Sequence, residues 1–374
     1  MGLKEAGDAN SLLHMMLSRF VVRFCSIVCL MVLGLALPTF SLAQDAAASK
    51  IERVQRGTAA LLKLYNRQTG LFDTTGWWNS ANSITVLDDA SALKHRKQFA
   101  PVFANTFVQA QTKFSGFLNE YYDDEGWWAL AWVGAYDRTH DKSYLKMAQS
   151  IFADMSGGWD DHCGGGIWWS KEHKYKNAIA NELFLSVAAT LALHSKGAER
   201  QRYLDWATRE WVWFHASGMI NGESLVNDGL DSACHNNHEA TWSYNQGVIL
   251  GGLVGLNRLT HDASLLQTAH AIAAAAIDHL TGVDGVLRDH CEPKCGGGDV
   301  PQFKGIFARN LIQLRKAAPD PQYVKFLNTN ADAVWMKARA ADDRFSLVWS
   351  GPANAGDAAT LTSALDVLVT AARD

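Results

Sequence analysis

Helical periodicity runs through almost the whole chain and limits the fold class more than any other feature. Apolar residues recur at intervals of three and four, the spacing that puts them on one helix face, and no comparable run of strict alternation appears. The segments with this spacing are 51–65, 99–118, 127–137, 144–155, 178–193, 202–214, 244–260, 265–280, 303–318, 322–340 and 360–372. We therefore predict an all-α protein with little strand.

The connections between these segments alternate between short and elaborate. The elaborate ones are rich in glycine, aspartate and tryptophan, as in TTGWWNS, SGGWDDHCGGGIWWS, VNDGLDSAC and HCEPKCGGGDVPQ. Helical hairpins repeated around an axis produce such an alternation, so we expect an α/α toroid of about six or seven hairpins. Its longer loops should gather on one face, above a central cleft. Because no low-complexity linker is visible, residues 44–374 are predicted to form one domain.

Residues 1–43 are predicted to be a signal peptide. The apolar run FCSIVCLMVLGLALPTF is preceded by Arg19 and Arg23 and is followed by small residues up to Ala43. A membrane anchor is the alternative, but the run is short and lacks a basic stop-transfer flank. We expect cleavage after Ala43, a secreted, periplasmic or cell-surface location, and no stable membrane span in the mature chain.

Net charge and composition limit the classes of partner that the chain is expected to bind. The formal net charge of -4 argues against nucleic-acid binding, and 14 tryptophans exceed what packing alone usually requires. We expect a monomer that uses no cofactor.

Four cysteines remain after removal of the signal: Cys163, Cys234, Cys291 and Cys295. An even number in an exported protein indicates disulfides, with three possible connectivities. The CEPKC loop favours a local bridge between Cys291 and Cys295, which leaves Cys163 with Cys234. Zinc is the alternative, since histidines at 162, 235 and 290 each adjoin a cysteine, but neither paired CxxC nor HExxH spacing is present. We therefore expect no metal.

The strongest chemical signal is YYDDEGWWALAWVGAY at 121–136, in which Asp123 and Asp124 lie between aromatic pairs. Glycosidic cleavage uses one carboxyl to protonate the leaving oxygen and another to attack or to activate water, and aromatic faces stack on pyranose rings. The alternative is a helix start, with one aspartate as the N-cap and Glu125 in the first turn. Neighbours within a helix point about 100° apart, so the pair could cooperate only from the first turn, at the roughly 5 Å that a retaining mechanism needs.

Other polar clusters have two interpretations each. Asp88-Asp89 is interpreted as a helix cap or a groove lining, Asp160-Asp161 lies among tryptophans, and Asp342-Asp343 is typical of a solvated turn. SYNQGVILGGL and DVPQFKGIFARNL each place polar side chains at a helix entrance, where capping and sugar binding are both possible.

Five motifs in order resemble glycoside hydrolase family 76, the endo-α-1,6-mannanases, which also includes fungal cell-wall proteins thought to act as transglycosylases. They are YYDDEGWWALAW, CGGGIWW with NAIANELF, DGL with Cys234, TWSYNQGVILGGL and GGGDVPQFKGIFARNL, and the resemblance covers about residues 55–370. It implies an (α/α)6 toroid and a retaining mechanism in which Asp123 is the nucleophile and Asp124 the acid/base. It also implies that a set of residues surrounds the groove: Trp127, Trp128, Tyr244, Asn245, Gln246, Asp299 and Lys304.

The spacing of Trp128 to Ala131 and Ala135 directs that indole toward the core, so Trp127 is the better candidate for the groove. The implied substrate is α-1,6-linked mannan or a manno-oligosaccharide. Three alternatives stay open: a transglycosylase acting on α-mannose-containing cell-wall or anchor glycans, a toroidal sugar epimerase or uronide hydrolase, and a non-catalytic glycan-binding protein.

Overall fold

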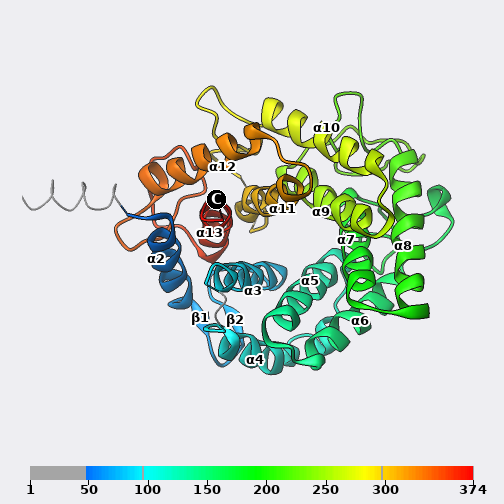
Figure 1. Ribbon diagram of the computed structural model, residues 1–374, viewed down its shortest axis with the longest axis horizontal. Coiled ribbons are helices and arrows are strands. Elements are labelled where there is room, and N and C mark those ends of the chain that lie inside the picture. The colour runs from blue at the N-terminus through cyan, green and yellow to red at the C-terminus, as the bar shows by residue number, and fades with distance from the viewer. Residues whose placement is uncertain (1–47, 95–96, 296–297, 374) are drawn as a thin grey trace, which may run out of the picture. The chain divides into compact units, whose positions relative to one another are not determined.

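The helices lie in two concentric rings (Figure 1). The computed structural model of the chain describes residues 48–94, 97–295 and 298–373, and the predicted signal peptide and its cleavage site lie outside these ranges. The inner ring consists of α3 (Trp77–Ala92), α5 (Tyr122–Thr139), α7 (Ala178–His194), α9 (Ser243–Thr260), α11 (Phe303–Ala317) and α13 (Ala358–Ala371). The outer ring consists of α2 (Lys50–Leu62), α4 (Ala100–Gln109), α6 (Lys142–Ser156), α8 (Gly197–Ala216), α10 (Ala263–His279) and α12 (Pro321–Ala333).

Each outer helix precedes an inner helix along the chain, which gives six hairpins within the described residues. Successive inner helices pack against one another, and α13 packs against α3, so the inner ring is closed. Residues Lys50–Asp374 thus form one unit, an α/α toroid. Among the residues that the structure describes, no helix combines the length and the apolar character needed to cross a bilayer.

Burial explains which helices belong to which ring. All 14 residues of α13 are buried, and α7 is buried along most of its length, as expected of helices enclosed on every side. The outer helix α6 instead buries one stripe, Tyr144, Ala148, Ile151, Phe152 and Met155, at the three and four spacing of an amphipathic helix. The outer ring therefore supplies one apolar face to an inner ring that is nearly all interior.

Regular strand is limited to one short hairpin in the described part of the chain. Strand β1 (Tyr65–Asn66) pairs antiparallel with β2 (Leu71–Phe72). The predicted helix 99–118 is α4 followed by two 3-10 turns, Ala110–Thr112 and Ser115–Phe117, and the predicted helix 322–340 is α12 ending in a π turn, Val334–Ala338. Two further 3-10 turns, His162–Gly164 and Val300–Gln302, lie in the loops. Helix α3 was missed: its first residues, 77–80, were assigned to the connection TTGWWNS, and the rest lies between the predicted segments 51–65 and 99–118.

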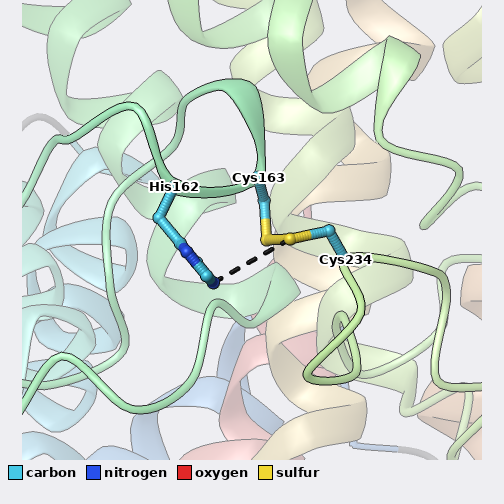
Figure 2. Close-up of side chains that lie close together, drawn as sticks. All are labelled: His162, Cys163 and Cys234. Carbon is cyan, nitrogen blue, oxygen red and sulfur yellow. Dashed lines mark hydrogen bonds between the residues drawn. A yellow bond between two sulfur atoms is a disulfide. The ribbon is translucent and has the colours of Figure 1, made fainter.

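Two disulfides pair the cysteines in the pattern that the sequence favours. Cys163 is bonded to Cys234 and Cys291 to Cys295. Figure 2 shows His162 beside the first bridge, with its Nε2 atom 3.9 Å from the Sγ atom of Cys234. These three residues form a cluster of potential metal ligands by proximity, but zinc binds cysteine as a thiolate, and both sulfurs here are bonded to each other.

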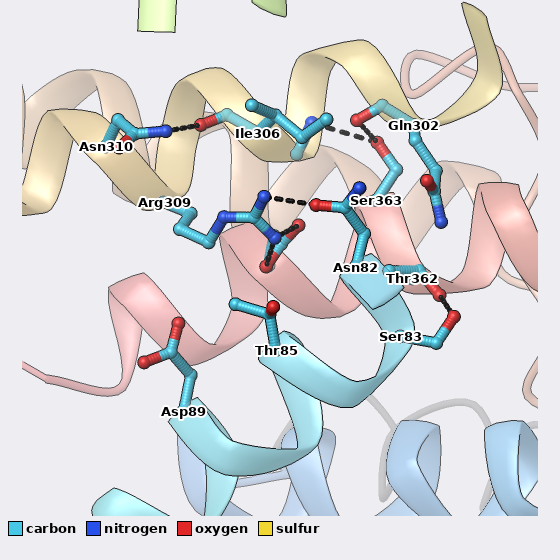
Figure 3. Close-up of polar contacts among 12 residues, drawn as sticks. Asn82, Ser83, Thr85, Asp89, Gln302, Ile306, Arg309, Asn310, Thr362 and Ser363 are labelled. Atoms are coloured by element: carbon cyan, nitrogen blue, oxygen red, sulfur yellow. Dashed lines mark hydrogen bonds and ion pairs between the residues drawn. The ribbon is translucent and has the colours of Figure 1, made fainter. Parts of the chain in front are cut away.

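A buried polar layer joins α3, α11 and α13 (Figure 3). The guanidinium of Arg309 on α11 donates to Asp366 on α13, at 3.3 Å to Oδ2, and to the side-chain carbonyl of Asn82 on α3. The hydroxyls of Ser83 and Thr362 lie 2.7 Å apart. The guanidinium also lies 5.9 Å from the ring of Trp127, so this layer supports the inner ring directly beneath an indole of the candidate site.

Close helix packing at Gly305 gives a stability prediction. A Cβ atom there would lie 2.5 Å from the Cα atom of Ser363 and 2.6 Å from its carbonyl oxygen, and backbone on α13 cannot yield as a side chain could. Gly305→Ala is expected to lower the free energy of unfolding by about 1–3 kcal/mol through overpacking, despite the better helix propensity of alanine. Urea titration measures the change. Gly222→Ala, where no atom lies within 4 Å, is the control, and an equal stability of both variants would contradict the packing argument.

Candidate active site

The N-terminal ends of the inner helices meet around one pocket of about 500 Å³. First-turn residues of four of these helices line it, because all inner helices of a hairpin toroid run in the same direction. The lining residues are Trp78, Tyr121, Asp123, Asp124, Trp127, Trp169, Tyr175, Asn177, Asp228, Tyr244, Asp299 and Phe303. Helix N-termini carry partial positive charge, so this end of the ring favours carboxylates and developing negative charge.

Asp123 and Asp124 lie in the first turn of α5, where the sequence places them. The N-cap is Tyr121, without a side-chain capping bond, so the prediction that an aspartate caps this helix is wrong. The Oδ2 atom of Asp123 accepts the indole N–H of Trp169 at 3.1 Å, while its Oδ1 atom is buried without a hydrogen-bond partner among the described residues. The Oδ2 atom of Asp124 accepts the side-chain amide of Asn119 at 2.6 Å. The Oδ1 atom of Asp123 therefore remains free to react.

Burial raises the pKa of both carboxyls. It raises the pKa of Asp123 well above its usual range, with a further contribution from the charge of Asp124, whereas the N–H of Trp169 acts in the opposite direction. It raises the pKa of Asp124 to about 7, against the hydrogen bond from Asn119. Buried carboxyls on adjacent residues titrate as a pair, so the first ionisation leaves a monoanion that holds one proton. One nucleophilic carboxylate and one proton donor is the state that a double displacement requires.

Glu125, the third acidic residue of the first turn, has a different role. It is fully buried, accepts the backbone N–H of Asn119 at 3.2 Å and pairs with Lys171 at 2.9 Å. Burial raises its pKa to about 8, although Lys171 opposes the shift. Glu125 therefore joins the segment before α5 to the segment that contains Lys171, and it does not line the pocket.

Aromatic rings form the walls of the pocket. Trp78 stacks on Trp127 with ring centroids 5.6 Å apart, and Tyr244 stacks on Phe303 at 3.7 Å. Tyr121, 41% exposed, and Trp169, 37% exposed, form the outer edge. Flat apolar surfaces beside carboxyl groups suit pyranose rings, whose faces are apolar and whose edges carry hydroxyls.

Three pairs of adjacent tryptophans each contribute one indole to the pocket wall. In each pair, one indole lines the pocket and the other does not: Trp78 and Trp77, Trp127 and Trp128, Trp169 and Trp168. Adjacent side chains diverge in direction, so a pair at a helix start or in an extended loop can serve core and pocket together. This repetition in the sequence was a signal that could have identified Trp78 and Trp169.

A third carboxyl, Asp228, lies on the pocket wall, within the segment VNDGLDSAC that was predicted only as a connection. It accepts the phenol of Tyr175 at 2.6 Å, and Tyr175 in turn accepts the side-chain amide of Asn237 at 2.9 Å. The predicted residue Asp299 also lines the pocket, where it accepts the indole N–H of Trp78 at 2.8 Å. The pocket thus has acceptors for sugar hydroxyls on more than one side.

Four residues expected around the groove lie in the interior instead. Trp128 is fully buried against Phe117 and Trp132, as its spacing to the alanines suggested. Lys304 is fully buried, where it pairs with Glu292 and donates to the Leu347 carbonyl at 2.8 Å.

Asn245 and Gln246 point away from the pocket because consecutive helix residues diverge. Gln246 accepts the Val226 N–H and donates to the Val226 carbonyl, both at 2.8 Å, so it anchors a loop. Asn245 is fully buried without a hydrogen-bond partner among the described residues. Of the SYNQ motif, only Tyr244 reaches the pocket.

Asp88 and Asp89 lie in the last turns of α3, away from the pocket. They pair with Arg138 at 2.9 Å and Arg373 at 2.6 Å, so the cap or groove interpretation of this motif is wrong. Burial raises the pKa of Asp88 to about 6, with Asp89 adding to the shift.

Comparison with known proteins decides the family. The family model described as glycosyl hydrolase family 76 matches residues 49–372. The chain belongs to this family. Among curated relatives, it is 28% identical over 288 residues to the mannan endo-1,6-alpha-mannosidase DFG5 of Candida albicans, covering 68% of this chain and 62% of that protein. It is 26% identical over 343 residues to the mannan endo-1,6-alpha-mannosidase DCW1 of Saccharomyces cerevisiae, covering 82% of this chain and 74% of that one.

Solved structures of the family share the toroid. An inactive variant of an alpha-1,6-mannanase of Salegentibacter sp., in complex with alpha-1,6-mannotetrose, superposes with a TM-score of 0.78 at 22% identity, covering 87% of this chain and 99% of that one. Dfg5 from Chaetomium thermophilum, in complex with glucosamine, gives a TM-score of 0.73 at 20% identity, with 86% and 91% covered. The predicted (α/α)6 fold is therefore confirmed.

Proposed function

We propose that the protein is a retaining glycoside hydrolase that cleaves α-1,6-mannosidic bonds in mannan. The observation that carries the proposal is the pair Asp123 and Asp124, held in the first turn of α5 and facing an aromatic pocket of about 500 Å³. Family membership and the names of the curated relatives support α-1,6-mannan as the substrate. The Salegentibacter mannanase, moreover, is inactive when two consecutive aspartates are replaced by alanine.

In the first step, Asp123 attacks the anomeric carbon while Asp124 gives its proton to the departing glycosidic oxygen. The bond between that carbon and oxygen breaks, and a mannosyl ester forms on Asp123. In the second step, the Asp124 carboxylate takes a proton from water, whose oxygen attacks the anomeric carbon and releases Asp123. Two inversions restore the α configuration. If a sugar hydroxyl replaces water, the same enzyme transfers mannosyl units.

Product analysis tests this proposal. Purified protein beginning at residue 44 is incubated with linear α-1,6-mannan, and products are followed by mass spectrometry. Shorter manno-oligosaccharides are expected from this polymer and none from β-1,4-mannan, whose linkage and anomeric configuration differ. Products longer than a defined oligosaccharide substrate would indicate transfer. An inert wild-type protein on the α-1,6 polymer would contradict the substrate proposal.

The pH profile of kcat/KM is expected to be bell-shaped. Its limbs should lie at higher pH than they would for a pair of exposed carboxyls. Asp124 acts protonated, so activity should fall as pH rises and the pair loses its remaining proton. Asp123 acts ionised, so activity should fall as pH decreases and the pair takes up a second proton; burial raises the pKa of Asp123 and so moves this limb upward. Trp169→Phe removes the N–H that opposes this shift, and it should move the acidic limb upward by about one pH unit. An unmoved acidic limb would contradict the role of that bond.

We also propose that the protein is exported. The disulfides between Cys163 and Cys234 and between Cys291 and Cys295 suit an oxidising compartment, and the mannan of the proposed reaction is a cell-envelope polymer. N-terminal sequencing of the protein from its native host tests whether the chain is cut after Ala43.

A further inference from the structure

The ammonium of Lys176 lies inside a cage of oxygen atoms from the loop that precedes it. Its Nζ atom is 2.7 Å from the Oδ1 atom of Asp160, 2.7 Å from the His162 carbonyl and 2.7 Å from the Gly165 carbonyl. The Gly166 carbonyl lies at 3.0 Å and the Asp160 carbonyl at 3.4 Å. We refer to these five oxygens as the oxygen cage. The lysine side chain is 1% exposed, so its charge is removed from water.

This arrangement resembles the coordination of a metal cation more than an ordinary lysine contact. An ammonium has three N–H donors, whereas five oxygens converge on this one, four of them backbone carbonyls. Carbonyl rings of this kind replace the hydration shell of a bare cation elsewhere in proteins. Asp160 supplies the negative charge, through its Oδ1 atom. Without a cation at its centre, the oxygen cage would consist of carbonyl dipoles that repel one another.

The oxygen cage is connected to the catalytic pair through the same loop. Asp160 also accepts the indole N–H of Trp168 at 2.7 Å. The next residue, Trp169, donates its indole N–H to Asp123. Its backbone N–H donates to the carbonyl of Tyr175 at 2.7 Å, which joins this loop to the segment that carries Lys176. The loop that Lys176 holds is therefore the loop that presents a donor to Asp123.

The backbone around Lys176 explains how a residue in the pocket wall can bind the loop behind that wall. Tyr175 and Asn177 line the pocket, and Lys176 lies between them, directly before the extended backbone of Asn177. Side chains alternate in direction along extended backbone, so the lysine points away from the pocket and into the loop behind it. Packing of the oxygen cage therefore fixes the wall of the pocket from behind.

We propose that Lys176 is a positioning residue whose ammonium serves as a tethered cation: by filling the oxygen cage, it orders the 160–169 loop and holds Trp169 against Asp123. This inference rests on the proposed function for its kinetic consequence. Its structural consequence, a cation requirement of the loop, is independent of any activity.

Chemical rescue tests the structural consequence. Lys176→Ala removes the side chain beyond Cβ and leaves a space that n-propylammonium fits. We expect the variant to unfold at a lower temperature than the wild type and to recover part of this loss in millimolar n-propylammonium, whereas neutral propanol has no effect. Lys176→Met is the matched control: its side chain fills the space without charge, so it should be destabilised and should not respond to the amine. An Ala variant that does not respond, or a Met variant as stable as the wild type, would overturn the proposal.

If the Ala variant does not fold, hydrogen exchange on the Met variant provides the test. The loop amides of residues 160–169 should exchange faster than in the wild type, while those of the distant helix α12 do not change. Equal exchange in the loop would overturn the proposal.

A double-mutant cycle tests the kinetic consequence. If Lys176 acts through Trp169, then Lys176→Met and Trp169→Phe should each lower kcat/KM and move the acidic limb of the pH profile upward. The loss from misplacing this donor is expected to be about 10- to 100-fold, and the double variant should be no worse than the more impaired single variant. Additive losses would overturn the coupling. An inactive wild type would instead contradict the proposed function, and the rescue experiment would still decide the role of Lys176.

Discussion

Asp123→Asn is expected to abolish turnover of α-1,6-mannan, with a loss of about 10⁴-fold or more. Asparagine matches the carboxylate in size but is too weak a nucleophile to form the mannosyl ester, so the first step has no other route. The fold should be unaffected, because one oxygen of Asp123 has no hydrogen-bond partner among the described residues and the other accepts the Trp169 indole N–H, which the side-chain oxygen of asparagine can also accept. Reducing-end release from the polymer measures the loss, and the unfolding temperature checks the fold.

Asp278→Asn is the matched control for this experiment. Asp278 lies on the outer helix α10, and its side chain is 85% exposed, so the same chemical change should leave both turnover and stability as in the wild type. Turnover by Asp123→Asn within tenfold of the wild type would contradict its assignment as the nucleophile.

The loss of activity in Asp124→Asn is expected to depend on the leaving group of the substrate. On mannan, loss of the proton donor should lower kcat/KM by about 10²–10⁴-fold. An aryl manno-oligosaccharide with an acidic phenol needs no protonation to depart, so its first step should be nearly as fast as in the wild type. The ester on Asp123 should then accumulate, because no base activates water for the second step.

Azide distinguishes this role from a general loss of structure. As an anionic nucleophile, it attacks the mannosyl ester without a base, so it should restore turnover of the aryl substrate by Asp124→Asn and release an α-mannosyl azide. Asp123→Asn should show no such rescue with an α product. A uniform loss on both substrates, without an effect of azide, would contradict the acid/base role of Asp124.

The sequence predicted the outer helices well because they are half exposed. Helices such as α6 bury one stripe and leave the other face polar, which is the pattern that periodicity detects. Helix α3 was missed, although the buried inner helices α7 and α13 were predicted at 178–193 and 360–372. Its buried residues include Asn79, Ser80, Asn82 and Ser83, so the local sequence resembles a polar connection. Three of them also bond to residues far along the chain, which are Gln302, Arg309 and Thr362.

The catalytic pair could be predicted because its chemistry lies within one short motif. The remainder of the pocket comes from loops that the toroid brings together: Trp169 reaches Asp123 across 46 residues and Tyr175 reaches Asp228 across 53. The directions in which neighbouring helix side chains point were also not predictable from the motif. Tyr244 lines the pocket while its neighbours Asn245 and Gln246 are buried, a difference of one residue that motif membership does not resolve.

Trapping of the covalent intermediate tests the central claim most directly. The wild-type protein is incubated with a 2-deoxy-2-fluoro-α-mannosyl fluoride, which forms the ester readily but slows its hydrolysis, and the digested protein is analysed by mass spectrometry. We predict one added fluoromannosyl unit on the peptide that contains Asp123, with fragment ions that place it on this residue. Active enzyme that carries no adduct, or an adduct on Asp124, would contradict the account.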